Sequence, residues 1–225
     1  MNTIGHLLEL ASIRGGKDLD RDFEILLCHC IGKSRAWLYS HSECSLGSVE
    51  SELFLNLVCQ RLSGIPTAYL VGRREFWSLD IEVNRYTLIP RHETELLVEW
   101  ALGLDLPAHA KVLDLGTGSG AIALALASER PNWQIHATDC CEQALLVAQK
   151  NSARLGLNQL SFSKSYWYES LLESHYWDLI ISNPPYIDWD NFTGDNGLSF
   201  EPHLALRAKD SGLSELRKII TGAPK

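Results

Sequence analysis

The sequence lacks an apolar run long enough to cross a membrane, and polar residues interrupt Leu7-Leu8 where a signal peptide would be apolar. We therefore expect a cytoplasmic protein with no membrane partner. A cluster of Lys and Arg is also missing, and the formal net charge is −8. Since proteins that bind a DNA duplex neutralise its phosphates with a basic stripe, direct binding of nucleic acid is not expected. An acidic enzyme would suit a basic protein partner, although a solvated acidic surface needs no partner.

The cysteines show neither paired Cys-x-x-Cys spacing nor the framework of a disulfide-rich protein. They are Cys28, Cys30, Cys44, Cys59, Cys140 and Cys141. We interpret them as free thiols in a reducing compartment. Cys28 and Cys30 would point to different faces of a helix, so no metal site is expected.

The most informative motif is Asn183-Pro184-Pro185-Tyr186, which directly follows an apolar run at 178–182. Two prolines fix φ and carry no N–H, so this turn presents carbonyl acceptors with little freedom. The Asn183 side chain adds an acceptor, and the Tyr186 ring offers a flat face for stacking. The combination suits a planar amino group and indicates an enzyme that methylates nitrogen. Taken alone, it would also fit a Pro-rich turn at the end of an edge strand.

A second motif upstream combines a short apolar strand, a glycine-rich turn at 116–120 and a helix of small and apolar residues. The glycines let the backbone approach a ligand closely, and the N-terminus of the helix offers free N–H groups to an anion. The next strand ends at Asp139, where an acidic residue commonly accepts hydrogen bonds from ribose hydroxyls.

The spacing of the glycines discriminates between cofactors. The nicotinamide fingerprint is G-x-G-x-x-G, whereas Gly116, Gly118 and Gly120 alternate here and Ala121 stands in the place of the third glycine. With Asp114 opening the loop, this form favours S-adenosyl-L-methionine over a dinucleotide. We expect its methionine-like end over the glycines and its ribose against Asp139.

Three parts are expected along the chain: a helical domain at 1–63, a hairpin linker at 64–91 and a catalytic domain at 92–225. In the last part we expect strands at 111–115, 134–138, 160–164 and 178–182, and helices at 119–129 and 142–155. This alternation predicts an α/β fold, with a parallel sheet covered by helices on both faces. The helical domain shows no catalytic group, so it either docks the substrate or only packs.

Apolar stripes at helical spacing support the helical domain. One stripe consists of Phe23, Leu26, Leu27 and Cys30, and the other of Val49, Leu53, Phe54, Leu57, Val58 and Leu62. Breaks between helices are expected at 15–16 and 32–34, where glycines interrupt the pattern.

Together these motifs resemble those of the peptide-chain release-factor glutamine methyltransferases, the HemK/PrmC family. The resemblance covers nearly the whole chain and is carried by the segments 65–72 with 75–77, 88–95, 116–120, 183–187 and 200–206. The segment 88–95 is the most specific, since other enzymes with Asn-Pro-Pro-Tyr lack it. The resemblance implies a Rossmann-like S-adenosyl-L-methionine-dependent methyltransferase domain behind a small helical domain. The expected substrate is the Gly-Gly-Gln glutamine of a class 1 release factor, and the expected state is a monomer.

The resemblance also implies site residues. Asn183, Pro184, Pro185 and Tyr186 would bind the substrate glutamine, and Asn183, Pro184 and Tyr186 would carry the catalytic role. The implied cofactor-binding residues are Gly116, Thr117, Gly118, Ser119, Gly120, Asp139, Trp167 and Asn183. Trp167 matches a tryptophan that lies beside the adenine in the family. The interpretation of Trp167 as an aromatic core residue is held equally. Two positions depart from the family: Tyr166 replaces an acidic residue, and His92 replaces a proline.

Family members continue well past the segment 211–213 with further strands, whereas this chain ends at Lys225. We therefore expect the C-terminal strands to be missing and the strand before Asn183 to present an unpaired edge, with reduced stability and activity. A truncated coding sequence, an edge supplied by a partner and a remnant all remain open. So do three alternatives for function: a ribosomal-protein glutamine methyltransferase, an adenine-N6 DNA methyltransferase and a non-catalytic binding protein.

Overall fold

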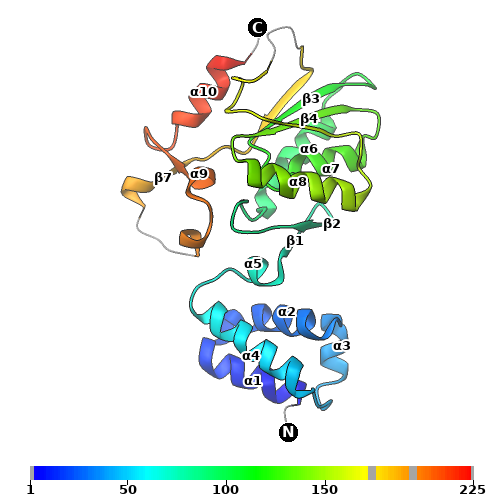
Figure 1. Ribbon diagram of the computed structural model, residues 1–225, viewed down its shortest axis with the longest axis vertical. Helices are drawn as coiled ribbons and strands as arrows, with labels where there is room; N and C mark the ends of the chain where they lie inside the picture. Colours follow the sequence, from blue (N-terminus) through cyan, green and yellow to red (C-terminus); the bar gives the residue numbers. More distant parts are fainter. Residues whose placement is uncertain (1–2, 172–175, 193–196, 224–225) are drawn as a thin grey trace. The chain divides into compact units, whose positions relative to one another are not determined.

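The computed structural model describes residues 3–171, 176–192 and 197–223. The chain divides into two compact units, Met1–Gly72 and Arg73–Lys225 (Figure 1). The segment 64–91 is therefore divided between them: its short helix belongs to the first unit and its hairpin to the second. Among the described residues, no helix combines the length and the apolar character needed to cross a membrane.

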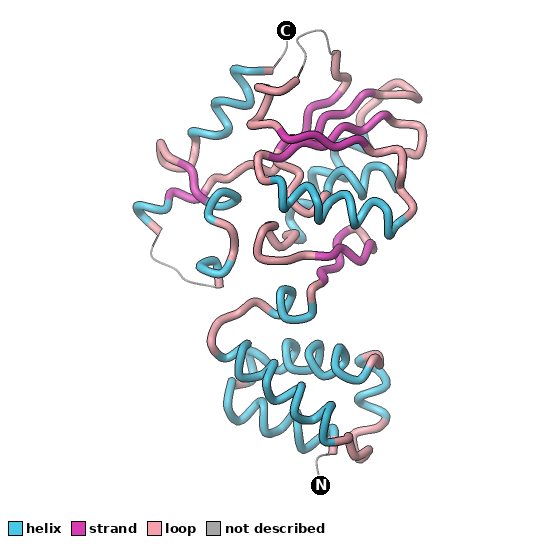
Figure 2. Tube along the Cα trace, in the orientation of Figure 1, coloured by secondary structure: helices cyan, strands magenta, loops and turns pink. Residues whose placement is uncertain are grey.

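The first unit is helical (Figure 2). It contains a 3-10 turn at Lys17–Leu19 and the helices α1 (Ile4–Gly15), α2 (Asp20–Ile31), α3 (Arg35–Ser40), α4 (Ser48–Leu62) and α5 (Thr67–Val71). The expected breaks are confirmed, since Gly16 and Gly32 end α1 and α2 at φ values of 81° and 64°. Glycine adopts this region without steric cost. Ser34 then starts α3 by accepting a hydrogen bond from the backbone N–H of Trp37.

The core of this unit confirms one apolar stripe and corrects the other. Phe23, Leu26 and Leu27 of α2 are buried as expected. On α4, the residues Phe54, Leu57 and Val58 are buried, whereas the other members of the stripe, Val49, Leu53 and Leu62, are exposed. The predicted stripe was wider than the face that α4 packs against α2.

The second unit begins with an antiparallel hairpin of β1 (Arg73–Phe76) and β2 (Leu79–Glu82). Its turn residues, Trp77 and Ser78, both have positive φ (52° and 58°), a conformation usually taken by Gly or Asn. Two bonds hold this turn in place: the Trp77 N–H donates to Glu95 at 2.9 Å, and its indole donates to Glu129 at 2.8 Å.

A four-stranded parallel sheet follows, in the order β5-β4-β3-β6. Its elements are α6 (Glu95–Gly103), β3 (Lys111–Leu115), α7 (Ala121–Glu129), β4 (Gln134–Asp139), α8 (Glu142–Leu155), β5 (Ser161–Lys164) and β6 (Leu179–Ser182). The expected strands and helices are thus confirmed to within two residues. Within the described residues, β6 lies at an edge of the sheet, as the sequence predicted.

Three helices of this part, α6, α7 and α8, pack together on one face of the sheet. Contacts join α6 to α7 and α7 to α8, and Figure 1 shows the three in one layer. The physical reason is the strand order: the right-handed crossovers from β3 to β4 and from β4 to β5 run in the same direction, so they place α7 and α8 on the same face.

Shorter elements complete the second unit. They are the 3-10 turns His92–Thr94, Trp189–Asn191 and Leu198–Phe200, the strands β7 (Ile187–Asp188) and β8 (Arg207–Ala208), and the helices α9 (His203–Leu206) and α10 (Ser214–Gly222). β7 and β8 pair in parallel. The register of the main sheet sets Leu115 of β3 beside both Thr138 and Ser182, so β3, β4 and β6 end at one level. The loops after these strands therefore meet at the edge where doubly wound sheets bind ligands.

Candidate active site

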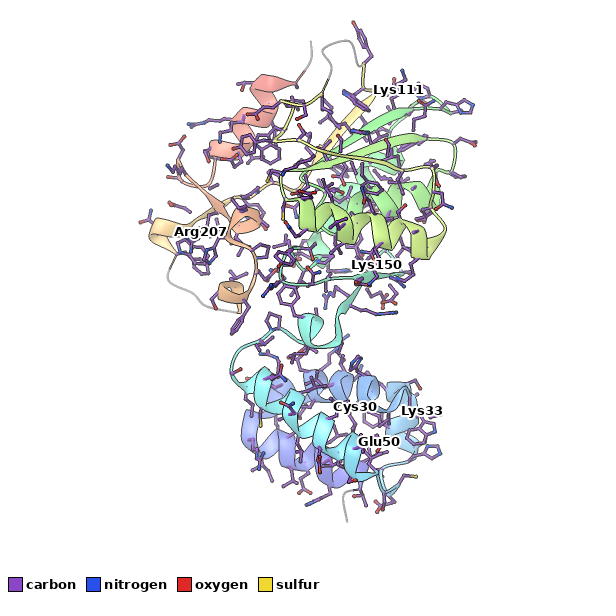
Figure 3. The ribbon with its side chains drawn as sticks, in the orientation of Figure 1. Cys30, Lys33, Glu50, Lys111, Lys150 and Arg207 are labelled. Carbon is purple, nitrogen blue, oxygen red and sulfur yellow. The ribbon has the colours of Figure 1, made fainter. Side chains whose placement is uncertain are left out.

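A pocket of about 740 Å³ lies at this carboxyl edge of the sheet. Most of the residues expected for the cofactor and the substrate line it: Gly116, Thr117, Gly118, Ser119, Asp139, Trp167, Asn183, Pro184 and Pro185. Two expected residues, Gly120 and Tyr186, are not part of the lining. Segments distant in sequence contribute the remaining wall, among them Arg207 of β8, whose side chain is labelled in Figure 3.

The glycine-rich loop is fixed by hydrogen bonds from its own backbone. The N–H of Thr117 donates to the carbonyl of Thr138 at 2.8 Å, and the N–H of Gly118 donates to the carboxylate of Asp139 at 2.9 Å. The second carboxylate oxygen of Asp139 accepts from the N–H of Cys141 at 2.8 Å. Burial raises the pKa of Asp139, and these two N–H groups act against that shift. The carboxylate is thus set rigidly in the pocket.

Asp114, at the end of β3, lies behind the loop. It is buried and accepts a hydrogen bond of 2.6 Å from the hydroxyl of Thr117. Burial raises its pKa to about 7, although the Thr117 hydroxyl bond lowers it in part. Asp114 therefore stabilises the glycine-rich turn through its hydrogen bond with Thr117.

Two of the three glycines of the loop, Gly118 and Gly120, serve different purposes. A Cβ on Gly118 (φ 58°) would meet nothing within 4 Å, so this glycine leaves open space beside the pocket. A Cβ on Gly120 (φ 87°) would lie 3.1 Å from both Ala148 and Leu124. Gly120 thus allows α7 and α8 to pack closely, which explains why it does not line the pocket. The open backbone at Gly118, with the carboxylate of Asp139, fits S-adenosyl-L-methionine and its ribose.

The substrate side of the pocket is built by the segment that contains Asn183. The side-chain amide of Asn183 donates to the hydroxyl of Thr94 at 3.1 Å. Ser182 anchors the strand end by donating its hydroxyl to the carbonyl of Leu115 at 2.7 Å. Pro184 is buried, and both prolines line the pocket. Thr94 also lines the pocket, and it belongs to the family-specific segment 88–95.

That segment is tied to the rest of the site by Glu201, whose side chain is 3% exposed. One carboxylate oxygen accepts from the N–H of Ile89 at 3.0 Å, and the other forms an ion pair with Arg91. Sequence reasoning noted both segments but did not see this contact, because 110 residues separate Arg91 from Glu201. His92, the departure from the family, is exposed and lies 3.1 Å from Glu95. The ion pair between Arg91 and Glu201 is therefore kept although His92 replaces a proline.

Tyr186 takes a different place from the other substrate residues. Its side chain is 58% exposed and lies outside the lining of the pocket. The backbone there is closely packed, since a Cβ on Gly212 (φ 87°) would lie 2.3 Å from the carbonyl oxygen of Tyr186. Gly212 therefore has to be glycine for the chain to leave the site in this direction.

Trp167 and Tyr166 form the aromatic wall of the pocket. The indole N–H of Trp167 and the hydroxyl of Tyr166 both donate to one carboxylate oxygen of Glu215 in α10, at 3.0 and 2.9 Å. Glu215 also lines the pocket, and sequence reasoning missed it. An acidic side chain therefore stands beside Trp167 even though residue 166 is a tyrosine.

Comparison with known proteins agrees with this geometry. Residues 92–195 match the family described as "Methyltransferase small domain", and residues 12–72 match "PrmC N-terminal domain". The release factor glutamine methyltransferase of Shewanella oneidensis is 50% identical over 196 residues, which are 87% of this chain and 68% of that protein. The enzyme of the same name from Xylella fastidiosa is 50% identical over 205 residues, or 90% and 74%. That of Pseudomonas aeruginosa is 42% identical over 226 residues, or 100% and 82%.

The Rossmann-like sheet, the glycine-rich loop and Asp139 define an S-adenosyl-L-methionine-dependent methyltransferase, as the sequence predicted. Within that class, the chain belongs to the release factor glutamine methyltransferase family.

Proposed function

We propose that this chain methylates the side-chain amide nitrogen of the glutamine in the Gly-Gly-Gln motif of a class 1 release factor. S-adenosyl-L-methionine is the methyl donor. The observation that carries the proposal is the orientation of Asn183: its N–H group is engaged by Thr94. Its oxygen is therefore left to accept a hydrogen bond at a pocket that also holds the cofactor loop.

The chemistry explains why the orientation matters. An amide nitrogen is a poor nucleophile, because its lone pair is shared with the carbonyl group. When bound, the cofactor supplies an electrophilic methyl group on a sulfonium. The residues of the chain have to hold the nitrogen in line and favour the positive charge that develops on it.

Asn183 and Pro184 meet both needs. The side-chain oxygen of Asn183 and the main-chain oxygen of Pro184 would accept the two N–H groups of the substrate amide. Both are fixed in advance, one by the bond to Thr94 and the other by the rigid proline backbone. A side-chain base is not required, since the proton on the methylated nitrogen is acidic and leaves to solvent. Tyr186, whose ring is exposed, would cover the plane of the bound amide.

The remaining assignments belong to this proposal. We assign substrate docking to the helical unit Met1–Gly72, and we expect a monomer that acts in the cytoplasm on a protein rather than on nucleic acid. The formal net charge of −8 supports a protein substrate, because a DNA methyltransferase would have to attract phosphates. A ribosomal-protein glutamine remains the second candidate, and it is distinguished by experiment.

The test is transfer of labelled methyl from S-adenosyl-L-methionine to a purified class 1 release factor, with a ribosomal-protein mixture and duplex DNA as competing acceptors. We expect label on the Gly-Gly-Gln glutamine, and its loss in Asn183→Ala. Asn132→Ala is the matched control, because Asn132 is exposed in the loop before β4, at the opposite end of that strand from Asp139. Label on another acceptor would replace the substrate assignment. A folded chain that binds the cofactor but labels no acceptor would identify a non-catalytic binding protein.

A further inference from the structure

Three consecutive aromatic residues, Tyr166, Trp167 and Tyr168, join the pocket wall to α10. Tyr166 and Trp167 donate to Glu215, and the hydroxyl of Tyr168 donates to the carbonyl of Ile219 at 3.1 Å. The helix comes close to this segment: a Cβ on Gly222 would lie 2.8 Å from the ring of Tyr168. One face of α10 is thus bound along its length to the aromatic segment.

Glu215 is the centre of this contact. Its side chain is 14% exposed, and it also accepts from Lys218 at 2.8 Å and from Ser214 at 3.1 Å. Burial alone would raise its pKa, but the bonds from Lys218, Tyr166 and Trp167 outweigh burial and lower it. Glu215 is therefore an ionised acceptor at neutral pH, and hydrogen bonds to an ionised acceptor are the strong ones.

Trp167 is held at both ends. Its N–H donates to Glu215, while the edge of its six-membered ring lies over Gly116, where a Cβ would come within 3.4 Å of Cζ3. Its backbone has φ 48°, a strained value for a bulky residue that persists only when the surroundings fix it. The indole is thus set between α10 and the cofactor loop.

The helix depends on the same contacts. Ser214–Gly222, all of which the structure describes, contains no buried residue. A helix of nine residues is marginal alone in water, so α10 relies on what it docks against.

We propose that Glu215 is a positioning residue of the cofactor site: it orients Trp167 against the glycine-rich loop and couples the docking of α10 to cofactor binding. The inference rests on the proposed function, since it takes the pocket as the S-adenosyl-L-methionine site. Binding is reciprocal, so a cofactor that needs Trp167 in this orientation must also stabilise α10. The carboxylate acts through Trp167 and not on the substrate.

The test measures the affinity of the full chain for S-adenosylhomocysteine by calorimetry, and the hydrogen exchange of residues 214–222 with and without it. We expect protection of α10 on binding. Glu215→Leu should weaken binding about tenfold, since it removes a charged acceptor, and Glu215→Gln should lie between, since its amide oxygen still accepts. Lys218→Met removes the same ion pair but keeps the acceptor, so affinity should stay within about twofold. In Glu215→Leu the loss should also appear as a raised KM for S-adenosyl-L-methionine, whereas Lys218→Met should keep the wild-type KM.

The outcomes separate the two proposals. A wild-type chain that does not bind S-adenosylhomocysteine overturns the proposed function and this inference with it. Binding by the wild type with unchanged affinity in Glu215→Leu overturns the inference alone. An equal loss in Glu215→Leu and Lys218→Met overturns it as well, because the ion pair and not the orientation of Trp167 would then matter. If Glu215→Leu fails to fold, Glu215→Gln is compared with Lys218→Met instead. A greater loss of affinity in Glu215→Gln supports the inference, and an equal affinity of the two variants overturns it.

Discussion

Asn183 donates its side-chain N–H to the hydroxyl of Thr94, 3.1 Å away, and in this orientation the oxygen of the Asn183 amide is left to accept at the pocket. An amide that rotates by half a turn would present donors where the substrate amide also has donors. Thr94→Val removes the acceptor at nearly constant volume. We expect kcat to fall by about 10- to 100-fold while the affinity for the cofactor stays unchanged, measured by methyl transfer and by calorimetry.

The matched control is Thr94→Ser, which keeps the hydroxyl and should retain most of the activity. Wild-type kcat in Thr94→Val would show that Asn183 is oriented without Thr94. A fall in both kcat and cofactor affinity would instead indicate that the whole loop had moved.

Glu201 and Arg91 form the anchor of the segment 88–95, and the two partners are unequally buried, at 3% and 33% exposed. Glu201→Ala leaves the N–H of Ile89 without its acceptor and Arg91 without its counter-ion. We expect the free energy of unfolding to fall by roughly 2–3 kcal/mol, measured by urea denaturation. Arg91→Met should cost less, about 1 kcal/mol, because Arg91 is one-third exposed and solvent screens its charge.

A larger loss of unfolding free energy in Arg91→Met than in Glu201→Ala would contradict this. It would mean that the contact of Glu201 with Arg91 stabilises the segment more than its contact with the backbone of Ile89. Glu201→Gln should fall between wild type and Glu201→Ala, since the amide oxygen can still accept from Ile89.

The sequence predicted the cofactor side of the site well, because its signals are local. The apolar strand, the glycine turn and Asp139 at the end of the next strand follow from periodicity and from the rule that parallel strands end at one edge. The positions of these elements were correct to within two residues. The face that each crossover helix covers was not predicted, because strand order, which sets that face, is not visible in a single sequence.

The substrate side was predicted less fully, because its supports are long-range. Thr94 and Asn183 are 89 residues apart, and Arg91 and Glu201 are 110 apart. No periodicity joins residues at such distances, so the sequence identified the segments without identifying their partners. The positive φ of Trp77 was likewise hidden, since neither Gly nor Asn marks that turn.

Gly118 and Gly120 form a natural pair for mutation, because both have positive φ but only one is crowded. Gly120→Ala places a methyl group 3.1 Å from Ala148 and Leu124, so we expect unfolding to become easier by roughly 2–3 kcal/mol. Gly118→Ala meets open space and should cost only about 1 kcal/mol of strain, but it should weaken cofactor binding more strongly. Urea denaturation and calorimetry measure the two effects. If one variant lost more than the other in both stability and cofactor affinity, this division of roles would be contradicted.

Asp114 should make stability depend on pH in an unusual direction for a carboxyl group. Burial raises its folded-state pKa to about 7, above the value of about 3.9 in an unfolded chain, so the folded state binds the proton more tightly. The stabilisation from protonation is fully present below the unfolded pKa and is lost as the pH rises through the folded pKa. We therefore compare wild type with Asp114→Asn by urea denaturation between about pH 5 and about pH 8. The difference in unfolding free energy should change by roughly 2 kcal/mol in favour of the variant as the pH rises.

Thr117→Val sharpens this test, because it keeps the carboxyl group and removes the hydroxyl that donates to it. Without that bond the charged form of Asp114 is less favoured, so its pKa should rise further and the loss of stability should extend to higher pH. With Asp114→Asn, residue 114 should contribute no pH dependence to the unfolding free energy, whether residue 117 is Thr or Val. A wild-type chain that matches Asp114→Asn at every pH would mean that water reaches the carboxylate and that the base of the cofactor loop is open.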